Sequence, residues 1–514
     1  MDPKQERIAI LDFGSQYTQL IARSIRKARV FCEIHPPHRT AEALAASRPA
    51  GIILSGGPNS VTEKGSARPD PAIFRMGVPV LGICYGMHLL TQQLGGEVRA
   101  VGAREYGGAT LRIDGGDPLF QGLGPTEPVW MSHRDESRVL PDGFRTLATT
   151  DTCPAAAIAH QEKRLYGIQF HPEVSHTVHG KELLANFLFR ICGCGGHWRS
   201  EEILQELIET VRAQVGDARV LCAVSGGVDS AVTALVVRRA IGDRLVCRFV
   251  DNGLLRRGEV EEVTAAFKGL FGDRLQVLDG RRQFFQALQG VADPEEKRRI
   301  IGHTFIRIFE TEVERIGGLD FLAQGTLYPD RIESTAIRGP SAVIKTHHNV
   351  GGLPEKMKLK LVEPLRDLFK DEVRELGRQL GMSESFVRRH PFPGPGLAVR
   401  VLGEVDEERV RLLQGVDAIF LEELRRAGLY DRIGQAFAVL LPVRSVGVMG
   451  DERTYQQVVA LRAVETQDFM TADWAHLEPE FLSLVSRRIV NETPGVNRVV
   501  YDISSKPPST IEWE

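Results

Sequence analysis

The sequence has no long hydrophobic run and no excess of charge of either sign. None of its stretches reaches the roughly 18 uncharged apolar residues that a membrane-spanning helix needs. The 64 lysines and arginines nearly balance the 67 aspartates and glutamates, which leaves a formal net charge of −3. That balance provides no bulk electrostatic attraction to nucleic acid or to an acidic membrane. We therefore expect neither nucleic acid nor a membrane among the partners of this protein.

Cysteine is scarce as well. Seven cysteines in 514 residues, odd in number and unevenly spread, do not indicate a disulfide framework. The polar and charged first residues also lack the apolar core of a secretory signal. Both absences predict a cytoplasmic protein.

The composition is otherwise that of an ordinary globular protein, with 42% hydrophobic, 25% charged and 7% aromatic residues. Such a composition excludes a fibrous or wholly disordered chain. At about 150 residues per domain, the length predicts roughly three domains.

Two series of short apolar runs alternate with longer amphipathic stretches. Residues 7–13 and 50–55 are two runs of the first series, and residues 219–224 begin the second. Apolar strands separated by helices are typical of parallel sheets with helices on both faces. The sequence thus predicts two successive parallel-sheet α/β domains, over residues 1–197 and 198–389.

A proline-rich segment ends the second series. Residues 391–396 read PFPGPG, which can neither be helical nor continue a central strand. A helical pattern over residues 407–427 and β-rich segments such as 438–448 follow. The third predicted domain, over residues 390–514, is therefore a small α+β domain.

The first candidate site is a cysteine on a sharp turn. Cys84 stands in a G-x-C-x-G motif that follows a predicted strand and precedes a helical pattern. In that setting the glycines permit a tight turn, and the helix N-terminus favours the thiolate. A buried structural cysteine beside a glycine turn would leave the same pattern.

Two other strand ends supply the groups that a cysteine nucleophile needs. His171 and Glu173 follow a strand pattern and, two residues apart, share one face of an extended segment. They are candidates for the base and for the acid that orients the base. Gly56 and Gly57 end an earlier strand, where backbone N–H groups are candidates for an oxyanion hole.

This combination resembles the class I glutamine amidotransferase family. The resemblance implies a Cys84–His171–Glu173 triad that hydrolyses glutamine through a thioester and releases ammonia. It also implies an oxyanion hole and glutamine pocket that include Gly56, Gly57 and Tyr85. Members of that family usually have Gln where this chain has His88, and Gly where it has Arg134. Both departures fall in segments that neighbour the glutamine pocket in the family.

The second candidate site is a glycine-rich loop between a predicted strand and a predicted helix. It comprises Ser225, Gly226, Gly227, Val228, Asp229 and Ser230. Backbone N–H groups and a helix N-terminus suit a phosphate or pyrophosphate there, and Asp229 is a candidate oxygen ligand for Mg²⁺. The loop is not a Walker A motif, and a plain glycine turn is the simpler alternative.

The glycine-rich loop resembles the pyrophosphatase loop of the ATP-pyrophosphatase family. Those enzymes adenylylate a substrate oxygen, release pyrophosphate and let a nitrogen or sulfur nucleophile displace AMP. Ammonia from the first site would be such a nucleophile.

Most of the remaining chain resembles the glutamine-hydrolysing GMP synthase family. The similarity lies in residues 250–256, 323–330, 344–353, 389–398 and 502–514. It implies the ATP- and Mg²⁺-dependent amination of XMP, the final step of guanine nucleotide synthesis. It further implies a homodimer formed through the third domain.

Individual roles follow from the same resemblance. XMP would be bound by Arg256, Asp330, Lys506, Thr510 and Glu512. Lys345 lies in a segment that resembles a lid over ATP and XMP. Without the resemblance, the last residues would be taken for a frayed polar tail, and Lys345 for a solvated surface lysine.

Three other functions stay open at this point. A glutamine-dependent NAD synthetase would share both motifs but not the last residues of the chain. A tRNA-thiolating enzyme would share the glycine-rich loop but needs a basic RNA surface, and we expect the isolated pair Arg388 and Arg389 to be merely solvated. A non-catalytic protein would be expected to lose Cys84 or the glycine-rich loop.

Overall fold

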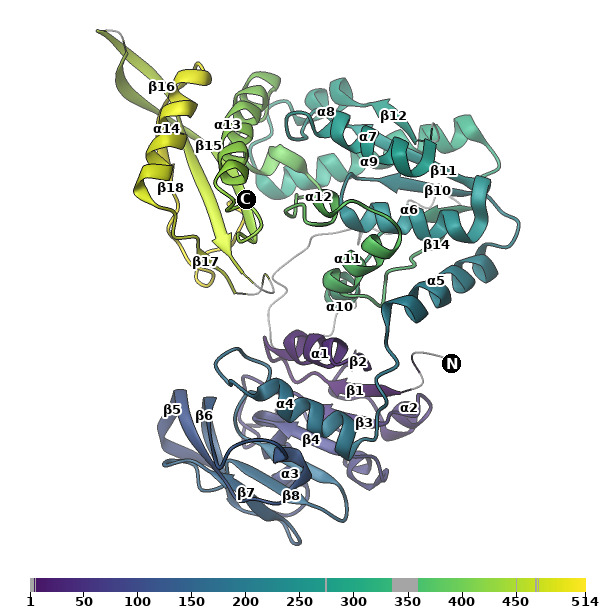
Figure 1. Ribbon diagram of the computed structural model, residues 1–514, viewed down its shortest axis with the longest axis vertical. Coiled ribbons are helices and arrows are strands. Elements are labelled where there is room, and N and C mark those ends of the chain that lie inside the picture. Colours follow the sequence, from purple (N-terminus) through teal and green to yellow (C-terminus); the bar gives the residue numbers. More distant parts are fainter. Residues whose placement is uncertain are drawn as a thin grey trace. The chain divides into compact units, whose positions relative to one another are not determined.

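The computed structural model (Figure 1) describes residues 4, 6–272, 275–334, 359–449, 451–466, 469 and 471–514. These residues form two compact units. The first holds the described residues up to 206 and residues 331–334, and the second holds those from 207 to 330 and from 359 onward. In this described part, no helix combines the length and the apolar character needed to span a membrane.

The first unit is built on one sheet with the strand order β2-β1-β3-β4-β9-β8-β7-β5-β6. Its parallel half consists of β2 (Phe31–His35), β1 (Arg7–Leu11), β3 (Gly51–Leu54), β4 (Val80–Ile83) and β9 (Leu165–Ile168). Its antiparallel half consists of β8 (Ala157–His160), β7 (Arg145–Thr149), β5 (Glu97–Ile113) and β6 (Thr126–Val139).

The parallel half agrees with the sequence prediction, and the antiparallel half adds strands that the sequence patterns did not indicate. Every residue of β3 and β4 is buried, as in a sheet covered on both faces. Along most of β6, buried residues alternate with more exposed ones, as in a strand with one face toward water. Such a strand has only half the apolar content of a buried one, so its signal in the sequence is weaker.

The helices of the first unit are α1 (Thr18–Lys27), α2 (Ala41–Ala45), α3 (Tyr85–Gln93) and α4 (Gly180–Ala185). Short 3₁₀ turns at Pro71–Arg75 and Pro118–Phe120 and a π-helical turn at Asn186–Ile191 complete it. Only Cys84 separates β4 from helix α3, and the first seven residues of the helix are all buried. The strand–turn–helix element at Cys84 therefore lies inside the core.

The second unit contains a parallel sheet with the order β12-β11-β10-β13-β14. Its strands are β10 (Val220–Val224), β11 (Leu245–Asp251), β12 (Leu275–Asp279), β13 (Phe321–Ala323) and β14 (Lys360–Val362). The helices along this part of the chain are α5 (Ser200–Val215), α6 (Val228–Ile241), α7 (Glu259–Phe271), α8 (Arg281–Leu288), α9 (Pro294–Ile316), α10 (Tyr328–Ser334), α11 (Lys370–Gln379) and α12 (Glu384–Val387). The 225–230 loop joins the central strand β10 to α6, at the carboxyl edge where parallel sheets bind ligands.

An α+β part completes the second unit. Its strands are β15 (Gln435–Met449), β16 (Glu452–Glu465), β17 (Asp473–Trp474) and β18 (Val496–Tyr501), and its helices are α13 (Glu407–Arg426) and α14 (Pro479–Glu492). The β15–β16 hairpin projects beyond these helices (Figure 1). One buried core joins Leu254 and Phe284 of the parallel-sheet part to Val410 and Phe420 of the α+β part. Because the two parts share a core, residues from both can contribute to one site.

The predicted succession of two α/β sheets and a small α+β part is confirmed. The predicted boundaries after residues 197 and 389 stay predictions.

Candidate active sites

Cys84 occupies the turn between β4 and α3 in a backbone conformation that non-glycine residues rarely adopt, with φ 52° and ψ −105°. The flanking glycines make room for this turn. A Cβ on Gly86 would lie 2.3 Å from Leu54 O, and one on Gly82 would lie 2.5 Å from the carbonyl carbon of Gly86. No larger residue fits at either position, which is the geometry of a nucleophile elbow.

His171 and Glu173 lie beside this turn, after β9. His171 Nδ1 and Glu173 Oε1 are 2.7 Å apart, and the Cys84 side chain lies close enough to interact electrostatically with the same imidazole. The His171 and Glu173 side chains are 5% and 0% exposed. Thr177 fixes the backbone here by donating to His171 O at 2.6 Å. Thiol, imidazole and carboxylate thus follow one another in the order that a nucleophile, its base and an orienting acid require.

The surroundings of His171 favour its protonated form. Burial disfavours the charged imidazolium, but the Glu173 carboxylate and the Cys84 side chain outweigh burial and hold the pKa of His171 well above its ordinary value. An imidazolium beside Cys84 stabilises the thiolate, which is the reactive form of cysteine.

A cavity of about 170 Å³ opens beside Cys84. Gly57 and Tyr85, two of the predicted pocket residues, line it. Gly56 packs against the His171 ring, where a Cβ would lie 3.2 Å from Cε1. The other lining residues are Pro58, Asn59, His88, Tyr106, Ser132, His133, Arg134 and Asp135. A cavity of this size, next to a thiol, suits a small polar substrate.

The 225–230 loop turns on Gly226, whose φ is +82°. Ser230 Oγ accepts from Ser225 N at 3.1 Å and donates to Gly227 O at 3.0 Å, which closes the turn. Gly227 is the N-cap of the 14-residue helix α6, and Val228 is the first helical residue. The backbone N–H groups of the first turn of α6 and the positive end of the helix dipole therefore meet at this loop, as phosphate binding requires.

Charged side chains surround the loop. Asp229 Oδ2 pairs with Lys370 Nζ at 3.5 Å, whereas Asp229 Oδ1 is buried without a hydrogen-bond partner in the described part of the chain. Arg389 Nη1 donates to Gly226 O at 3.2 Å, and its Nη2 pairs with Glu262 at 3.1 Å. The prediction that Arg389 is a solvated residue was wrong, because its side chain is only 22% exposed. Lys370 and Arg389 are single basic residues in mixed segments, so the sequence carried no signal for them.

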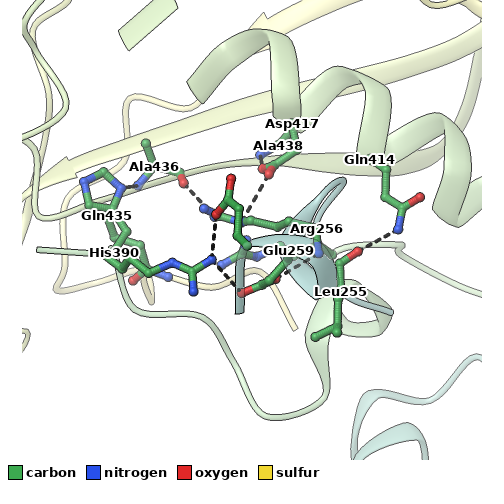
Figure 2. Close-up of polar contacts among 12 residues, drawn as sticks. Leu255, Arg256, Glu259, His390, Gln414, Asp417, Gln435, Ala436 and Ala438 are labelled. Atoms are coloured by element: carbon green, nitrogen blue, oxygen red, sulfur yellow. Dashed lines mark hydrogen bonds and ion pairs between the residues drawn. The ribbon is translucent and has the colours of Figure 1, made fainter. Parts of the chain in front are cut away.

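The residues predicted to bind the acceptor nucleotide lie in several places of the second unit. Arg256 is largely buried, with its Nε 3.2 Å from Asp417 Oδ2 and its Nη2 donating to Ala436 O at 3.1 Å (Figure 2). Burial lowers the pKa of Arg256, while Asp417 acts in the opposite direction. Asp330 lies at the start of α10, where it accepts from Leu327 N at 2.9 Å.

Glu512 and Arg256 are hydrogen-bonded to neighbouring residues of β15, Gln435 and Ala436. Gln435 Nε2 donates to Glu512 Oε1 at 2.7 Å, and the next residue, Ala436, accepts from Arg256. Figure 2 shows Gln435, Ala436 and Arg256 next to one another. His390 also belongs to this cluster, since its Nδ1 accepts from Ala436 N at 3.2 Å.

The other predicted contacts lie elsewhere in the last segment of the chain. Lys506 Nζ donates to Phe469 O at 2.7 Å, and Thr510 Oγ1 donates to Glu512 O at 2.5 Å. Lys345, predicted to belong to a lid, lies outside the described residues.

Known proteins match this chain from end to end. Residues 9–191 match the family model "Glutamine amidotransferase class-I", and residues 422–513 match "GMP synthase C terminal domain". The chain is 57% identical over 507 residues to "GMP synthase (glutamine-hydrolyzing)" of Aquifex aeolicus, with 99% of both chains covered. The chain belongs to the glutamine-hydrolysing GMP synthase family. Proteins of the same name from Nitratiruptor sp. and Symbiobacterium thermophilum are 55% and 54% identical, with 99% and 100% of each chain covered.

Membership of the GMP synthase family removes the other functions that the motifs left open. An NAD synthetase or a tRNA-thiolating enzyme would share single motifs, whereas the GMP synthases match along 99% of this chain. The predictions of fold class, family and enzyme class are thereby confirmed.

His88 and Arg134, the two departures from the amidotransferase pattern, both line the cavity beside Cys84. His88 Nε2 is 2.7 Å from Gln169 Oε1, and burial lowers the pKa of His88 to about 4, so the imidazole is neutral at pH 7. Arg134 Nη2 pairs with Glu63 Oε1 at 2.8 Å, and 42% of the Arg134 side chain is exposed. Both residues are thus engaged with protein partners in this member of the GMP synthase family.

Proposed function

We propose that this chain couples two sites to make GMP from XMP, ATP, glutamine and water, with AMP, pyrophosphate and glutamate as the other products. The reaction is that of a carbon–nitrogen ligase with glutamine as nitrogen donor. One observation carries the proposal: a Cys–His–Glu constellation and a phosphate-binding loop lie in separate units of one chain that matches GMP synthases over 99% of its length. We assign the amidotransferase to residues 1–197, ATP activation to 198–389, and acceptor binding and dimerisation to 390–514.

At the first site, the Cys84 thiolate attacks the carboxamide carbon of glutamine. Protonated His171 then donates its proton to the departing ammonia, and a thioester remains. Neutral His171 next takes a proton from water, which hydrolyses the thioester to glutamate and restores the thiolate–imidazolium pair. Glu173 holds His171 in orientation throughout. Backbone N–H groups at Gly56, Gly57 and Tyr85 are assigned to the developing oxyanion.

At the second site, the 225–230 loop binds the β- and γ-phosphates of ATP through its N–H groups. The C2 oxygen of XMP attacks the α-phosphorus, so that pyrophosphate leaves and the oxygen is adenylylated. Ammonia then attacks C2, and AMP departs with the oxygen. Lys370 and Arg389, both in contact with the loop, place positive charge where pyrophosphate develops its negative charge.

Mg²⁺ fits this site through Asp229. The buried Oδ1 of Asp229 has no hydrogen-bond partner among the described residues, and in the same part of the chain no group of three or more His, Cys, Asp or Glu side chains could hold a metal ion. One carboxylate together with substrate phosphates is the usual way in which nucleotide enzymes hold Mg²⁺. When bound, the ion neutralises charge on the phosphates of ATP.

We assign the acceptor XMP to Arg256, Asp330, Lys506, Thr510 and Glu512. Arg256 and Lys506 supply positive charge for the 5′-phosphate, and the others supply polar contacts. Lys345 is assigned to a lid over both nucleotides.

We further propose a cytoplasmic homodimer formed through the β15–β16 hairpin. Val446, Val448 and Tyr455 are 45%, 74% and 63% exposed, and Val446 stands directly opposite Tyr455 in the hairpin register. Apolar side chains gathered on a projecting hairpin are unfavourable in water and are best covered by a second copy of the chain.

The cysteines support the proposed cytoplasmic location. All seven lie in the described part and carry free thiols, which agrees with a reducing compartment.

The conversion of XMP to GMP, followed by ultraviolet absorbance, tests the two-site proposal. Glutamine and ammonium are compared as nitrogen sources with ATP and Mg²⁺, in wild type, Cys84→Ala and Cys153→Ala. Cys153 is a matched control, because it is a buried cysteine of the same unit that lies outside the triad. We expect wild type and Cys153→Ala to use both sources and Cys84→Ala to use only ammonium. A Cys84→Ala variant that still uses glutamine, or a wild type that makes no GMP from either source, would refute the proposal.

A further inference from the structure

Three buried cations hold the last segment of the chain, residues 502–514. Lys297 on α9, Arg400 and Arg462 on β16 each have a side chain that is 0% exposed. A charge buried to this degree persists only where its partners are close and well oriented. Each of these three cations finds such partners in the same segment.

Lys297 is the most tightly placed of the three. Its Nζ donates to Ala398 O at 3.1 Å, to Val401 O at 2.7 Å and to Glu514 Oε2 at 2.5 Å. A lysine ammonium has three N–H donors, and all three are therefore used. The other oxygen of the Glu514 carboxylate accepts from Gly403 N at 3.3 Å. Glu514 is thus fixed at both carboxylate oxygens.

The neighbouring residue on α9 fixes the backbone of the same glutamate. Arg298 Nη2 donates to the main-chain oxygen of Glu514 at 2.6 Å. The start of α9 is stabilised by Asp293, which caps the helix by accepting from Glu296 N at 2.8 Å. Lys297 and Arg298 therefore present a fixed pair of cations to Glu514.

Arg400 and Arg462 fix the rest of the segment. Arg400 binds the Glu512 carboxylate through Nη2 at 2.8 Å and Nε at 3.1 Å. Arg462 donates to Ser504 O at 2.5 Å and to Thr510 O at 3.2 Å. The residues assigned above to XMP, from Lys506 to Glu512, lie between the attachments at Ser504 and Glu514, and two of them, Thr510 and Glu512, are attached directly.

We infer that Lys297 is a positioning residue for the acceptor nucleotide: its ion pair with Glu514 ties the XMP-binding segment to α9 of the ATP-binding part. The inference rests on the proposed function, since it needs residues 506–512 to contact XMP. When a segment is already ordered before the ligand binds, binding carries a smaller entropic cost of ordering it. Without the ion pair the segment is less ordered before XMP binds, but it adopts the same conformation in the complex. Part of the binding free energy of XMP is then used to order the segment. The affinity for XMP therefore decreases, whereas the rate of the saturated enzyme stays nearly unchanged.

Lys297→Met and Glu514→Gln test this role in the ammonium-dependent reaction. Met removes the ammonium at similar length, and Gln keeps an oxygen acceptor but removes the charge. Arg299→Met is the matched control, because Arg299 is on the same helix in an exposed pair with Glu296. We expect the KM for XMP to rise about tenfold in Lys297→Met and about threefold in Glu514→Gln. The KM for ATP, the kcat at saturating XMP and the glutaminase rate should stay within about twofold of wild type, and Arg299→Met should match wild type throughout.

A merely structural role would give a different pattern. It would raise the KM values for XMP and ATP together, or lower kcat at saturating XMP, and either result would overturn the inference. An unchanged KM for XMP in a folded Lys297→Met would also overturn it. If Lys297→Met does not fold, the milder Glu514→Gln decides by the same criteria. A wild type that makes no GMP would instead overturn the proposed function, so the two failures are distinguishable.

Discussion

The reactivity of Cys84 depends on side chains that orient its base, His171, and keep the imidazole protonated. Glu173 lies 2.7 Å from His171 and raises the pKa of the imidazole, which in turn favours the Cys84 thiolate. The reactive thiolate–imidazolium pair is lost at high pH, when the imidazolium gives up its proton. Glu173 therefore sets the upper end of the pH range in which the glutaminase works.

Glu173→Gln should move that upper limit. Without the carboxylate the pKa of His171 falls, so the alkaline limb of the glutaminase profile of kcat/KM should shift to lower pH, and kcat should fall by about a hundredfold or more. Glutamate release measured from pH 5 to 10 checks this, with the exposed Glu182→Gln on α4 as control. An alkaline limb at the wild-type pH would show that Glu173 does not control His171.

His88 makes the first unit sensitive to acid. Burial lowers its pKa from 6.5 to about 4, against the opposing effect of its hydrogen bond to Gln169. Between these values the unfolded chain binds a proton that the folded one does not. Protonation of His88 therefore does not lower the free energy of unfolding above pH 6.5. As the pH falls from 6.5 toward 4, that free energy decreases by about 1.4 kcal/mol per pH unit.

His88→Gln should remove this dependence. We expect the urea midpoint of the first unit to fall less steeply from pH 6.5 to 4.5 than in wild type, whereas the exposed His38→Gln should keep the wild-type slope. Circular dichroism during urea titration measures both. Equal slopes for all three proteins would contradict a neutral, buried His88.

Single residues differ in how well the sequence predicts them. Cys84 was predictable because the turn that it occupies admits only glycine on either side, and this requirement is visible as a motif. Lys297 and Arg389 were not, because one basic residue in an amphipathic helix or a mixed loop looks the same whether it is solvated or buried. Their partners, Glu514 and Gly226, lie 217 and 163 residues away, so only the fold brings them together.

At the level of the element, the loop between β10 and α6 is held from outside as well as by its own serines. Arg389 Nη1 reaches the carbonyl of Gly226, the residue with positive φ on which the loop turns. The strand–turn–helix pattern predicted the loop. The pattern did not predict its hydrogen bond to Arg389, because Arg389 follows α12 and is far from the loop in the sequence.

Arg389→Gln should therefore weaken ATP binding. We expect the KM for ATP in the ammonium-dependent reaction to rise about fivefold to tenfold, since a charge-assisted hydrogen bond to the loop is lost, while the glutaminase rate stays at the wild-type value. The neighbouring Arg388→Gln is the control, because Arg388 is 54% exposed and pairs with Glu384 and Asp431 on the surface. Equal effects of the two substitutions would contradict a specific role of Arg389.

The sheet of the first unit shows where patterns of apolar residues reach their limit. Runs such as β3 and β4 are buried on both faces and stand out in the sequence. The long pair β5 and β6 is antiparallel, and β6 alternates between buried and exposed residues, so its pattern resembles that of many loops with scattered apolar residues. The parallel half was therefore predictable, and the antiparallel half was not.

At the level of the whole molecule, the projecting β15–β16 hairpin is the basis for the proposed homodimer. Val448→Asp places a charge among the exposed apolar residues of the hairpin and should shift the protein toward monomers. The control, Val178→Asp, changes an equally apolar residue of the first unit that is 58% exposed. Light scattering coupled to size exclusion over a range of concentrations distinguishes the two variants. A Val448→Asp protein that stays as dimeric as wild type would place the interface elsewhere.

The coupling of the two sites can be tested by following the nitrogen atom itself. Wild type and Cys84→Ala are given XMP, ATP, Mg²⁺, glutamine labelled with ¹⁵N in its amide, and an equal concentration of unlabelled ammonium, and the mass of the GMP formed is measured. We predict that most of the GMP from wild type carries ¹⁵N and that the GMP from Cys84→Ala carries none. Unlabelled GMP from a wild type that hydrolyses glutamine, or labelled GMP from Cys84→Ala, would contradict the transfer of ammonia from Cys84 to XMP.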